Sequence, residues 1–347
     1  MTDYLFNGTI PAFRNRPLPS MDKRYLELQA WLASKLHSNF TLTLLSGDAS
    51  FRRYFRIAHN NQSFVAMDAP PSKEDLSSFI KIAEILEKHQ VLTPRILERN
   101  LEHGFLLLSD LGDNLFLQTL TAGTVHHLYK LAFTTLHQIQ SCSLEKQTLP
   151  LFNEEMILRE LSLFVEWFLE KHLELRLSSS EKKIIEKTFS FLINAALEQP
   201  QVFVHRDYHS RNLLLLSNDQ VGVLDFQDAV LGPITYDLIS LTRDCYIAWP
   251  DQKVEQWIVD FQKEALERKK LKETSQELFL CWADWMGIQR HLKAIGIFSR
   301  LNYRDNKSMY LNDIPRTLNY VHTISKNHSQ LNSFYHWLED AVMSKQA

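Results

Sequence analysis

The sequence has few of the features that mark secreted, membrane-spanning or nucleic-acid-binding proteins. Its three cysteines, Cys142, Cys245 and Cys281, lack CxxC spacing and an even count, which argues against a disulfide framework or a zinc site. No apolar run approaches the roughly 18 residues of a membrane-spanning helix. Lys and Arg total 38 against 41 Asp and Glu, so no excess of one charge favours nucleic acid or anionic lipid. We therefore expect a cytoplasmic protein whose cysteines serve packing.

We likewise expect no secretory signal in the N-terminal residues, because no basic segment precedes an apolar core. Three prolines and the absence of periodicity predict an extended segment over residues 1–20. A single hydrophobic core stops growing at about 250 to 300 residues. The 347 residues are therefore enough for two lobes, which we expect over residues 21–110 and 111–347.

Short strand patterns dominate the first third of the chain. They cover residues 41–47, 50–59, 63–70, 94–100 and 104–112, with a turn at Asn60-Asn61. Between the third and fourth, "SKEDLSSFIKIAEILEKHQ" predicts an amphipathic helix from Ser72, with a capping box formed by Ser72 and Asp75. We therefore predict a five-stranded antiparallel sheet with one helix.

Long helical patterns dominate the rest of the chain. They lie at roughly 122–141, 153–175, 180–198, 251–268 and 273–299, and strand character returns in residues 202–226. The fold class is accordingly α+β, with a small β lobe followed by a larger, mainly helical lobe. A ligand would be expected between two such lobes.

The stretch "VFVHRDYHSRNLLLL", residues 202–216, places many polar residues between two apolar runs. His205, Arg206, Asp207 and Asn212 fit the pattern HRDxxxxN, and "VGVLDFQD" then places Asp225 after a second apolar run. This arrangement resembles the catalytic and metal-binding loops of the protein-kinase-like superfamily. The resemblance implies ATP and Mg²⁺ as cofactors, with Asp207 orienting the acceptor hydroxyl and with Asn212 and Asp225 as metal ligands. The alternative is that Asp207 and Asn212 only cap turns.

Few residues separate Asp225 from "GPITYDLISL", too few for the peptide-docking segment of protein kinases. Residues 202–244 are similar to the aminoglycoside phosphotransferase and choline kinase branch, which implies a small-molecule acceptor. In that branch the Asp of a Tyr-Asp pair supports the catalytic loop, a role that would fall to Asp237 here. We expect His205 to support the loop in the same way, without contacting the substrate. Asp237 could equally be a simple charge at a helix N-terminus.

The nucleotide-binding part departs from the superfamily pattern. "VAMD" puts Asp68 where the third strand normally carries a Lys, and Phe79 stands near the position of its partner Glu. The loop that is usually rich in glycine has Gly47 alone, so Ser50 and backbone amides would have to bind phosphate. We expect Arg53 to point into the cleft, near the phosphates or Asp68, or alternatively into solvent. The resemblance places the adenine and ribose at Ser109, Asp110 and Leu111.

Several longer motifs narrow the resemblance. "SGDASFRRYFR", "MDAPP", "LLLSDLGD", "HRDYHSRNL" and "GIQRHLKAIGIFSRLNYRD" are similar to the bacterial anomeric kinases of cell-wall recycling, from about residue 45 to residue 320. Those enzymes phosphorylate N-acetylmuramate and N-acetylglucosamine at the C1 hydroxyl. The resemblance implies a sugar 1-phosphate product, used again in peptidoglycan synthesis, and indicates no obligatory protein partner.

A basic stripe agrees with an acidic sugar as substrate. Helical spacing puts Arg290, Lys293, Arg300 and Arg304 on one face, although Asn302 could end the helix earlier. The lactyl carboxylate of N-acetylmuramate needs a cation, so Arg290 is a candidate for substrate binding, while a solvated face is the alternative. Four residues next to the catalytic groups in the sequence are further candidates to bind the sugar: His209, Arg211, Gln227 and Asp228.

Two other functions stay open at this point. The acceptor could be another small alcohol, such as an aminoglycoside or choline. The missing Lys and Glu would also fit a degenerate nucleotide-binding regulator, but such a protein has no physical need for Asp207, Asn212 and Asp225 together.

Overall fold

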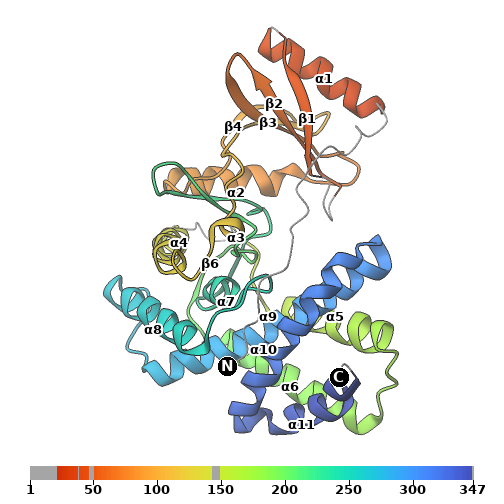
Figure 1. Ribbon diagram of the computed structural model, residues 1–347, viewed down its shortest axis with the longest axis vertical. Coiled ribbons are helices and arrows are strands. Elements are labelled where there is room, and N and C mark those ends of the chain that lie inside the picture. Colours follow the sequence, from red (N-terminus) through yellow and green to blue (C-terminus); the bar gives the residue numbers. More distant parts are fainter. Residues whose placement is uncertain (1–21, 38, 47–50, 143–148, 346–347) are drawn as a thin grey trace. The chain divides into compact units, whose positions relative to one another are not determined.

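The structure is a computed structural model that describes residues 22–37, 39–46, 51–142 and 149–345 (Figure 1). The chain folds into two compact units. The first comprises the chain up to Glu74 together with Ile96–Asp110, and the second comprises Asp75–Arg95 together with the chain from Leu111 onward. The expected extended segment, residues 1–20, lies outside the described residues.

The first unit contains a five-stranded antiparallel sheet with the strand order β1-β2-β3-β5-β4. The predicted strands are confirmed, with bounds β1 (Thr41–Ser46), β2 (Arg53–His59), β3 (Gln62–Asp68), β4 (Ile96–Asn100) and β5 (Phe105–Ser109). The β2–β3 turn is formed by Asn60 and Asn61, both with positive φ. Asparagine tolerates this left-handed backbone better than most residues, which explains the tight hairpin.

A helix that the sequence analysis did not predict covers one face of this sheet. Helix α1 (Lys23–Leu36) begins after Asp22, whose carboxylate accepts a hydrogen bond from the backbone N–H of Tyr25. Its buried residues Tyr25, Leu28 and Leu32 recur at helical spacing. They pack against a row of apolar side chains from β2, β3 and β5, namely Phe55, Ile57, Ala66, Phe105 and Leu107. The prediction of a single helix for this part of the chain was therefore incomplete.

The second unit begins with α2 (Leu76–Lys88), which confirms the predicted amphipathic helix but not its start. Asp75 caps the helix by accepting from the backbone N–H of Ser77, so the expected capping box at Ser72 is wrong. The unit also contains two short antiparallel pairs of strands, β6 (Gln201–Val204) with β9 (Val230–Pro233) and β7 (Leu213–Leu215) with β8 (Val221–Val223), of which the second is a hairpin.

Helices form most of the second unit. The five long helices predicted from periodicity correspond to α4 (Val125–Ile139), α5 (Glu154–Leu163) with the π-helix η1 (Phe164–His172), α6 (Ser179–Leu197), α8 (Asp251–Glu267) and α9 (Gln276–Asp305). Helix α7 (Tyr236–Thr242) begins at the Tyr-Asp pair. Sequence periodicity did not predict α3 (Phe116–Thr119), the 3-10 turns η2 (Ser308–Asp313), η3 (Ser329–Leu331) and η4 (Met343–Lys345), or the helices α10 (Ile314–Asn327) and α11 (Asn332–Ala341).

Helix α9 is the longest element and lies in the core of the second unit. It continues past Asn302 and ends at Asn306, whose left-handed backbone caps it. A Cβ at Gly296 would lie 2.4 Å from the carbonyl carbon of Leu163, so α9 approaches the end of α5 with backbone against backbone. No helix among the described residues is long and apolar enough to span a bilayer.

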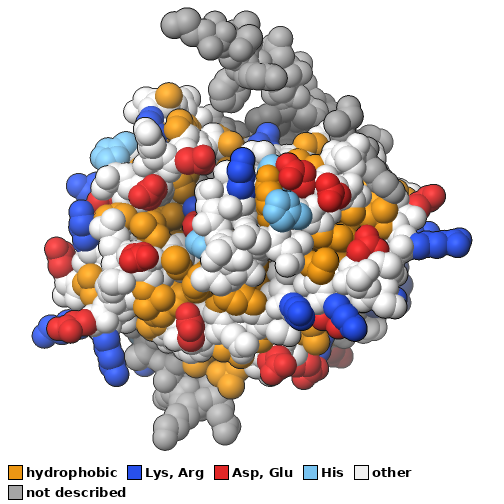
Figure 2. Space-filling view, turned by 90° about the horizontal axis from the view of Figure 1, so that it is seen from below, with side chains coloured by type: hydrophobic (Ala, Val, Ile, Leu, Met, Phe, Trp, Pro, Cys, Tyr) orange, Lys and Arg blue, Asp and Glu red, His pale blue; other side chains and the backbone are white. Residues whose placement is uncertain are grey.

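Surface charge follows the balanced composition. Figure 2 shows basic and acidic side chains interspersed among apolar and neutral groups on the face that it draws. This distribution agrees with the formal net charge of −3.

Candidate active site

The loop that carries Asp207 connects β6 to β7, and two buried carboxylates hold its backbone. Asp237, at the start of α7, accepts hydrogen bonds from the backbone N–H groups of His205 at 2.6 Å and Arg206 at 3.0 Å. Asp244, just after α7, accepts from the backbone N–H groups of Ser210 at 2.9 Å and Tyr246 at 2.8 Å. Burial raises the pKa of Asp237 to about 7, against these two amide bonds, which favour its carboxylate form. Short helix α7 thus fixes the loop from both ends.

His205 connects this loop to the strand that leads to Asp225. Its Nε2 lies 3.0 Å from the carbonyl oxygen of Leu224, and its Nδ1 accepts from the backbone N–H of Asp207 at 3.3 Å. The proton therefore sits on Nε2. Burial lowers the pKa of His205 to about 4, so the ring is neutral near pH 7. A neutral ring can donate on one side and accept on the other, as this geometry requires.

Asn212 directly precedes β7, and Asp225 lies two residues after β8, the other strand of the same hairpin. Leu213 pairs with Val223, and the backbone N–H of Leu224 donates to the carbonyl oxygen of Asn212 at 2.9 Å. The side-chain nitrogen of Asn212 donates to the backbone carbonyl oxygen of Asp207 at 3.0 Å. The side-chain oxygen of Asn212 therefore points away from that carbonyl. An amide oxygen and a carboxylate of this kind are hard donors that suit Mg²⁺.

Two residues in this region have an unusual backbone. Arg206 has φ 76° and Asp225 has φ 61°, both in the left-handed region that non-glycine residues rarely adopt. Such strain persists where the surrounding structure imposes it, and it often accompanies function. Here the imposing contacts on Arg206 are the amide bond to Asp237 and an ion pair with Glu160.

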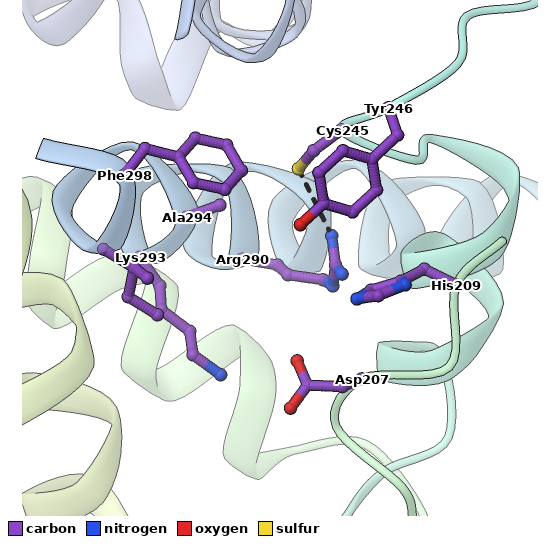
Figure 3. A pocket seen from close by; sticks show the side chains of 9 residues that line it. Asp207, His209, Cys245, Tyr246, Arg290, Lys293, Ala294 and Phe298 are labelled. Carbon is purple, nitrogen blue, oxygen red and sulfur yellow. Dashed lines mark hydrogen bonds between the residues drawn. The ribbon is translucent and has the colours of Figure 1, made fainter. Parts of the chain in front are cut away.

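A cavity in the second unit opens beside Asp207 (Figure 3). The residues that line it are Asp207, His209, Cys245, Tyr246, Arg290, Lys293, Ala294, Ile297 and Phe298. The side chains of Arg290 and Lys293 extend from α9 toward Asp207, and the guanidinium of Arg290 lies between Tyr246 and His209. Burial alone would raise the pKa of Asp207, but Lys293, His209 and Arg290 lower it to about 2. Asp207 is therefore a carboxylate throughout the physiological range.

Lys293 belongs to a buried network of charged residues that no sequence motif predicted. Its ammonium lies 3.1 Å from a carboxylate oxygen of Glu160 and donates to the Tyr236 hydroxyl at 2.9 Å. Glu160, on α5, also accepts from Arg206 and, at 3.0 Å, from Gln289. Although burial raises the pKa of Glu160, Lys293 and Arg206 hold it below its usual value. The network connects α5, α9 and the Asp207 loop.

The other substrate candidates take different positions. Arg211 lies with its guanidinium 3.6 Å from the centre of the Tyr246 ring, beside the cavity wall. Gln227 is buried and donates to Asp225 at 2.8 Å, and the side chain of Asp228 is exposed. Arg300 is half-buried and Arg304 is exposed beside Asp305, and neither lines the cavity. Of the four residues in the basic stripe, Arg290 and Lys293 thus line the cavity, and Arg300 and Arg304 do not.

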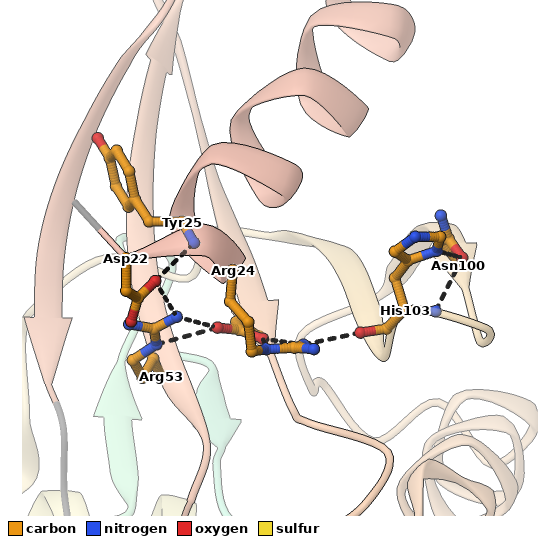
Figure 4. Close-up of polar contacts among 7 residues, drawn as sticks. Asp22, Arg24, Tyr25, Arg53, Asn100 and His103 are labelled. Carbon is orange, nitrogen blue, oxygen red and sulfur yellow. Dashed lines mark hydrogen bonds and ion pairs between the residues drawn. The ribbon is translucent and has the colours of Figure 1, made fainter.

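The nucleotide candidates lie partly in each unit, and Ser50 lies outside the described residues. Arg53 stands opposite Asp68 in the sheet and binds it at 2.5 Å, on the face that α1 covers (Figure 4). Its guanidinium also binds Asp22, and Asp68 binds Arg24 on its other side. Arg56 donates to Asp110 at 2.7 Å, and Ser109 ends β5. Leu111 is half-buried at the beginning of the long stretch that belongs to the second unit.

Three polar residues around Asp207 were not predicted from the sequence. Asp244 lies seven positions after Asp237 in "YDLISLTRD", a regular spacing of two helical turns that could have indicated it. Tyr246 and Glu160 carried no such signal, because only the packed structure brings them to the loop.

Comparison with known proteins identifies the family of the chain. A family profile described as "Phosphotransferase enzyme family" matches residues 41–274. The chain belongs to this phosphotransferase family. The N-acetylmuramate/N-acetylglucosamine kinase of Pseudomonas aeruginosa is 42% identical over 88% of this chain and 93% of its own length. The protein of the same name from Neisseria meningitidis is 38% identical over 92% of this chain and 96% of its own length.

Solved structures share the fold of this phosphotransferase. A Plasmodium vivax ethanolamine kinase superposes with a TM-score of 0.64 at 12% identity, over 86% of this chain and 87% of the other. The ADP-bound aminoglycoside phosphotransferase APH(2'')-Ib gives 0.57 at 16% identity, over 85% of this chain and 97% of the other. The predicted α+β, kinase-like fold class is confirmed, and the chain is a phosphotransferase enzyme.

Proposed function

We propose that this phosphotransferase transfers the γ-phosphoryl group of ATP to the anomeric hydroxyl of N-acetylmuramate or N-acetylglucosamine. The observation that carries the proposal is the pair of buried cations, Arg290 and Lys293, that face Asp207 in the cavity. A polycationic aminoglycoside would be repelled there, whereas an acidic or neutral sugar would not. The names of the relatives support the same two sugars.

Asp207 would accept a hydrogen bond from the anomeric hydroxyl and direct its oxygen at the γ-phosphorus. The new oxygen–phosphorus bond forms as the bond to the β-phosphate bridging oxygen breaks, and ADP leaves. The hydroxyl proton passes to Asp207 and then to solvent. With a pKa of about 2, Asp207 is a weak base, so its main contribution is orientation rather than early deprotonation.

The donor set beside Asp207 fits a magnesium ion. The side-chain oxygen of Asn212 and the carboxylate of Asp225 would hold it, and it would neutralise charge on the phosphates. Gln227, which donates to Asp225, would orient that carboxylate. His205 would keep the two loops in register by its bonds to Leu224 and Asp207.

We assign nucleotide binding to residues 21–110, with contacts at Ser50, Ser109, Asp110 and Leu111, and acceptor binding to residues 111–347. Because the guanidinium of Arg53 binds Asp22 and Asp68, its part in phosphate binding would be smaller than the sequence suggests. His209 and Arg211 are the nearest further candidates for sugar contact, and Asp228, with an exposed side chain, would act at the rim.

The test is the structure of the product. The purified protein is incubated with ATP, Mg²⁺ and each sugar, and ³¹P and ¹H NMR identify the phosphorylated carbon. We expect splitting of the anomeric proton by phosphorus. Asp207→Asn should lower kcat by roughly 100- to 10,000-fold while ATP still binds. Turnover with only choline or an aminoglycoside would indicate a different acceptor, and ATP binding without turnover on any acceptor would indicate a regulator.

A further inference from the structure

Arg290 is a buried cation that no carboxylate of the described chain neutralises by direct contact. Its side chain is 6% exposed, its Nε makes no hydrogen bond, and one terminal nitrogen lies 3.8 Å from the sulfur of Cys245. Burial raises the pKa of the Cys245 thiol, so this contact is with a neutral, weak acceptor. A buried guanidinium normally has an anion within hydrogen-bond distance, and this one is directed into a cavity instead.

The neighbouring cations differ from Arg290 in this respect. Lys293 binds Glu160 and the Tyr236 hydroxyl, and Arg206 binds Glu160. Asp207 is the one carboxylate among the described residues that line the cavity, and the proposed reaction uses it for the acceptor hydroxyl. Arg290 is therefore left to bind an anion that arrives from outside the protein.

We infer that Arg290 is the specificity residue that binds the carboxylate of the acceptor, which is the lactyl carboxylate of N-acetylmuramate. This inference depends on the proposed function. N-acetylmuramate and N-acetylglucosamine differ by the lactyl ether on C3, so a cation that binds its carboxylate acts on one sugar and not on the other. A guanidinium can bind a carboxylate through two parallel hydrogen bonds, which supplies both affinity and orientation.

The wall of the cavity next to Arg290 also suits a lactyl group. Ala294 and Phe298 follow Arg290 at successive helical turns of α9 and face the same cavity, together with Ile297. They provide an apolar surface beside the guanidinium for the lactyl methyl group. The same helix would then bind the charged and the apolar end of this substituent.

The test compares both sugars as acceptors for the wild type, Arg290→Gln and Arg290→Lys. In Arg290→Gln we expect kcat/KM for N-acetylmuramate to fall at least roughly 20-fold more than kcat/KM for N-acetylglucosamine, mostly through KM, because both sugars lose the effect of Arg290 on Asp207 but only one loses a carboxylate contact. Arg290→Lys should recover part of the loss, since it restores the charge but not the two-point geometry. Arg304→Gln, an exposed member of the same helix, should keep the wild-type ratio between the two sugars.

A second measurement needs no substitution at a buried site. The wild type should use N-acetylmuramate at least roughly 10-fold better than its methyl ester, which keeps the lactyl group but lacks the charge. An equal loss on both sugars in Arg290→Gln would overturn the inference and leave the proposed function intact, as would equal use of acid and ester by the wild type. Failure of the wild type to phosphorylate either sugar would overturn the proposed function itself.

Discussion

The carboxylate of Glu160 lies 3.1 Å from the ammonium of Lys293, and both side chains are almost fully buried. Either residue alone would destabilise the fold here, because an unpaired buried charge costs several kcal/mol. Their pairing places a cation beside Asp207 while the protein supplies the counter-charge from a different helix. Removing the partner should therefore affect both stability and chemistry.

Glu160→Gln should lower the free energy of unfolding by about 3 kcal/mol, since it leaves Lys293 and Arg206 buried without a carboxylate. Urea denaturation measures this change. Glu155→Gln is the matched control on the same helix, because Glu155 forms an exposed pair with Arg159 at 2.8 Å and should contribute less than about 0.5 kcal/mol. Equal stability of the two variants would show that the buried network does not stabilise the fold.

Substitution of the two carboxylates that hold the catalytic loop should separate kcat from KM. Asp237→Asn loses at least one amide bond next to Asp207, so kcat should fall roughly 10- to 100-fold with a small change in KM. Asp244→Asn keeps only one oxygen to accept from the backbone N–H groups of Ser210 and Tyr246, and Tyr246 lines the cavity, so KM for the sugar should also rise. Steady-state kinetics with ATP and the sugar measure kcat and both KM values for each variant. The same kinetic profile for both variants would contradict separate roles.

Asp68 stands where the third strand of the superfamily normally carries a Lys, and substitution there tests what the acidic residue does in the first unit. Asp68→Lys restores the residue type expected on this strand in the kinase-like superfamily, but it would put a third cation between Arg24 and Arg53. We expect a loss of about 3 kcal/mol or more in unfolding free energy. Glu98→Gln removes the exposed pair with Lys35, also between α1 and the sheet, and should cost less than about 1 kcal/mol. A stable Asp68→Lys protein would show that the ion pairs with Asp68 do not hold α1.

Stability should decrease at acid pH partly because of buried histidines. Burial lowers the pKa of His137 to about 3, below an unfolded value of 6.5, although its Nε2 lies 3.4 Å from a carboxylate oxygen of Glu264. The unfolded state therefore binds the proton more readily, and this contribution is lost as the pH falls below about 6.5. In His137→Phe, which can still stack on Phe261, the loss of unfolding free energy between pH 7 and pH 5 should be about 2 kcal/mol smaller.

The control for this prediction is His126→Gln, an exposed position on the same helix, which should keep the wild-type pH dependence. His205 and His291 have pKa values lowered by burial in the same direction, so the wild-type decrease should exceed the part due to His137. An unchanged pH profile in His137→Phe would mean that His137 titrates alike in the folded and unfolded states.

The sequence predicted the chemistry of the loop better than its surroundings. Asp207, Asn212 and Asp225 lie within about 20 residues, and local patterns relate them through two short strands. The hairpin register pairs Leu213 with Val223, so the segments that carry Asn212 and Asp225 leave the same end of the hairpin. The functional roles of these residues remain predictions.

Contacts over long sequence distances explain what the sequence did not reveal. Glu160 reaches Lys293 across 133 positions and Asp68 reaches Arg24 across 44, and neither pair forms a local pattern. Helix α1 did have a local signal, Asp22 followed by Tyr25, Leu28 and Leu32, but the preceding proline-rich segment obscured it. Lys293 belonged to a recognised stripe, yet periodicity alone could not tell a cavity wall from a solvated face.

Gly296 shows how a residue outside the cavity governs its electrostatics. Any larger residue there would force α9 away from Leu163, and Arg290 and Lys293 would move with the helix while Asp207, on another element, would not. A change in how α9 packs against α5 would therefore shift the two cations relative to Asp207 without any change in the catalytic loop itself.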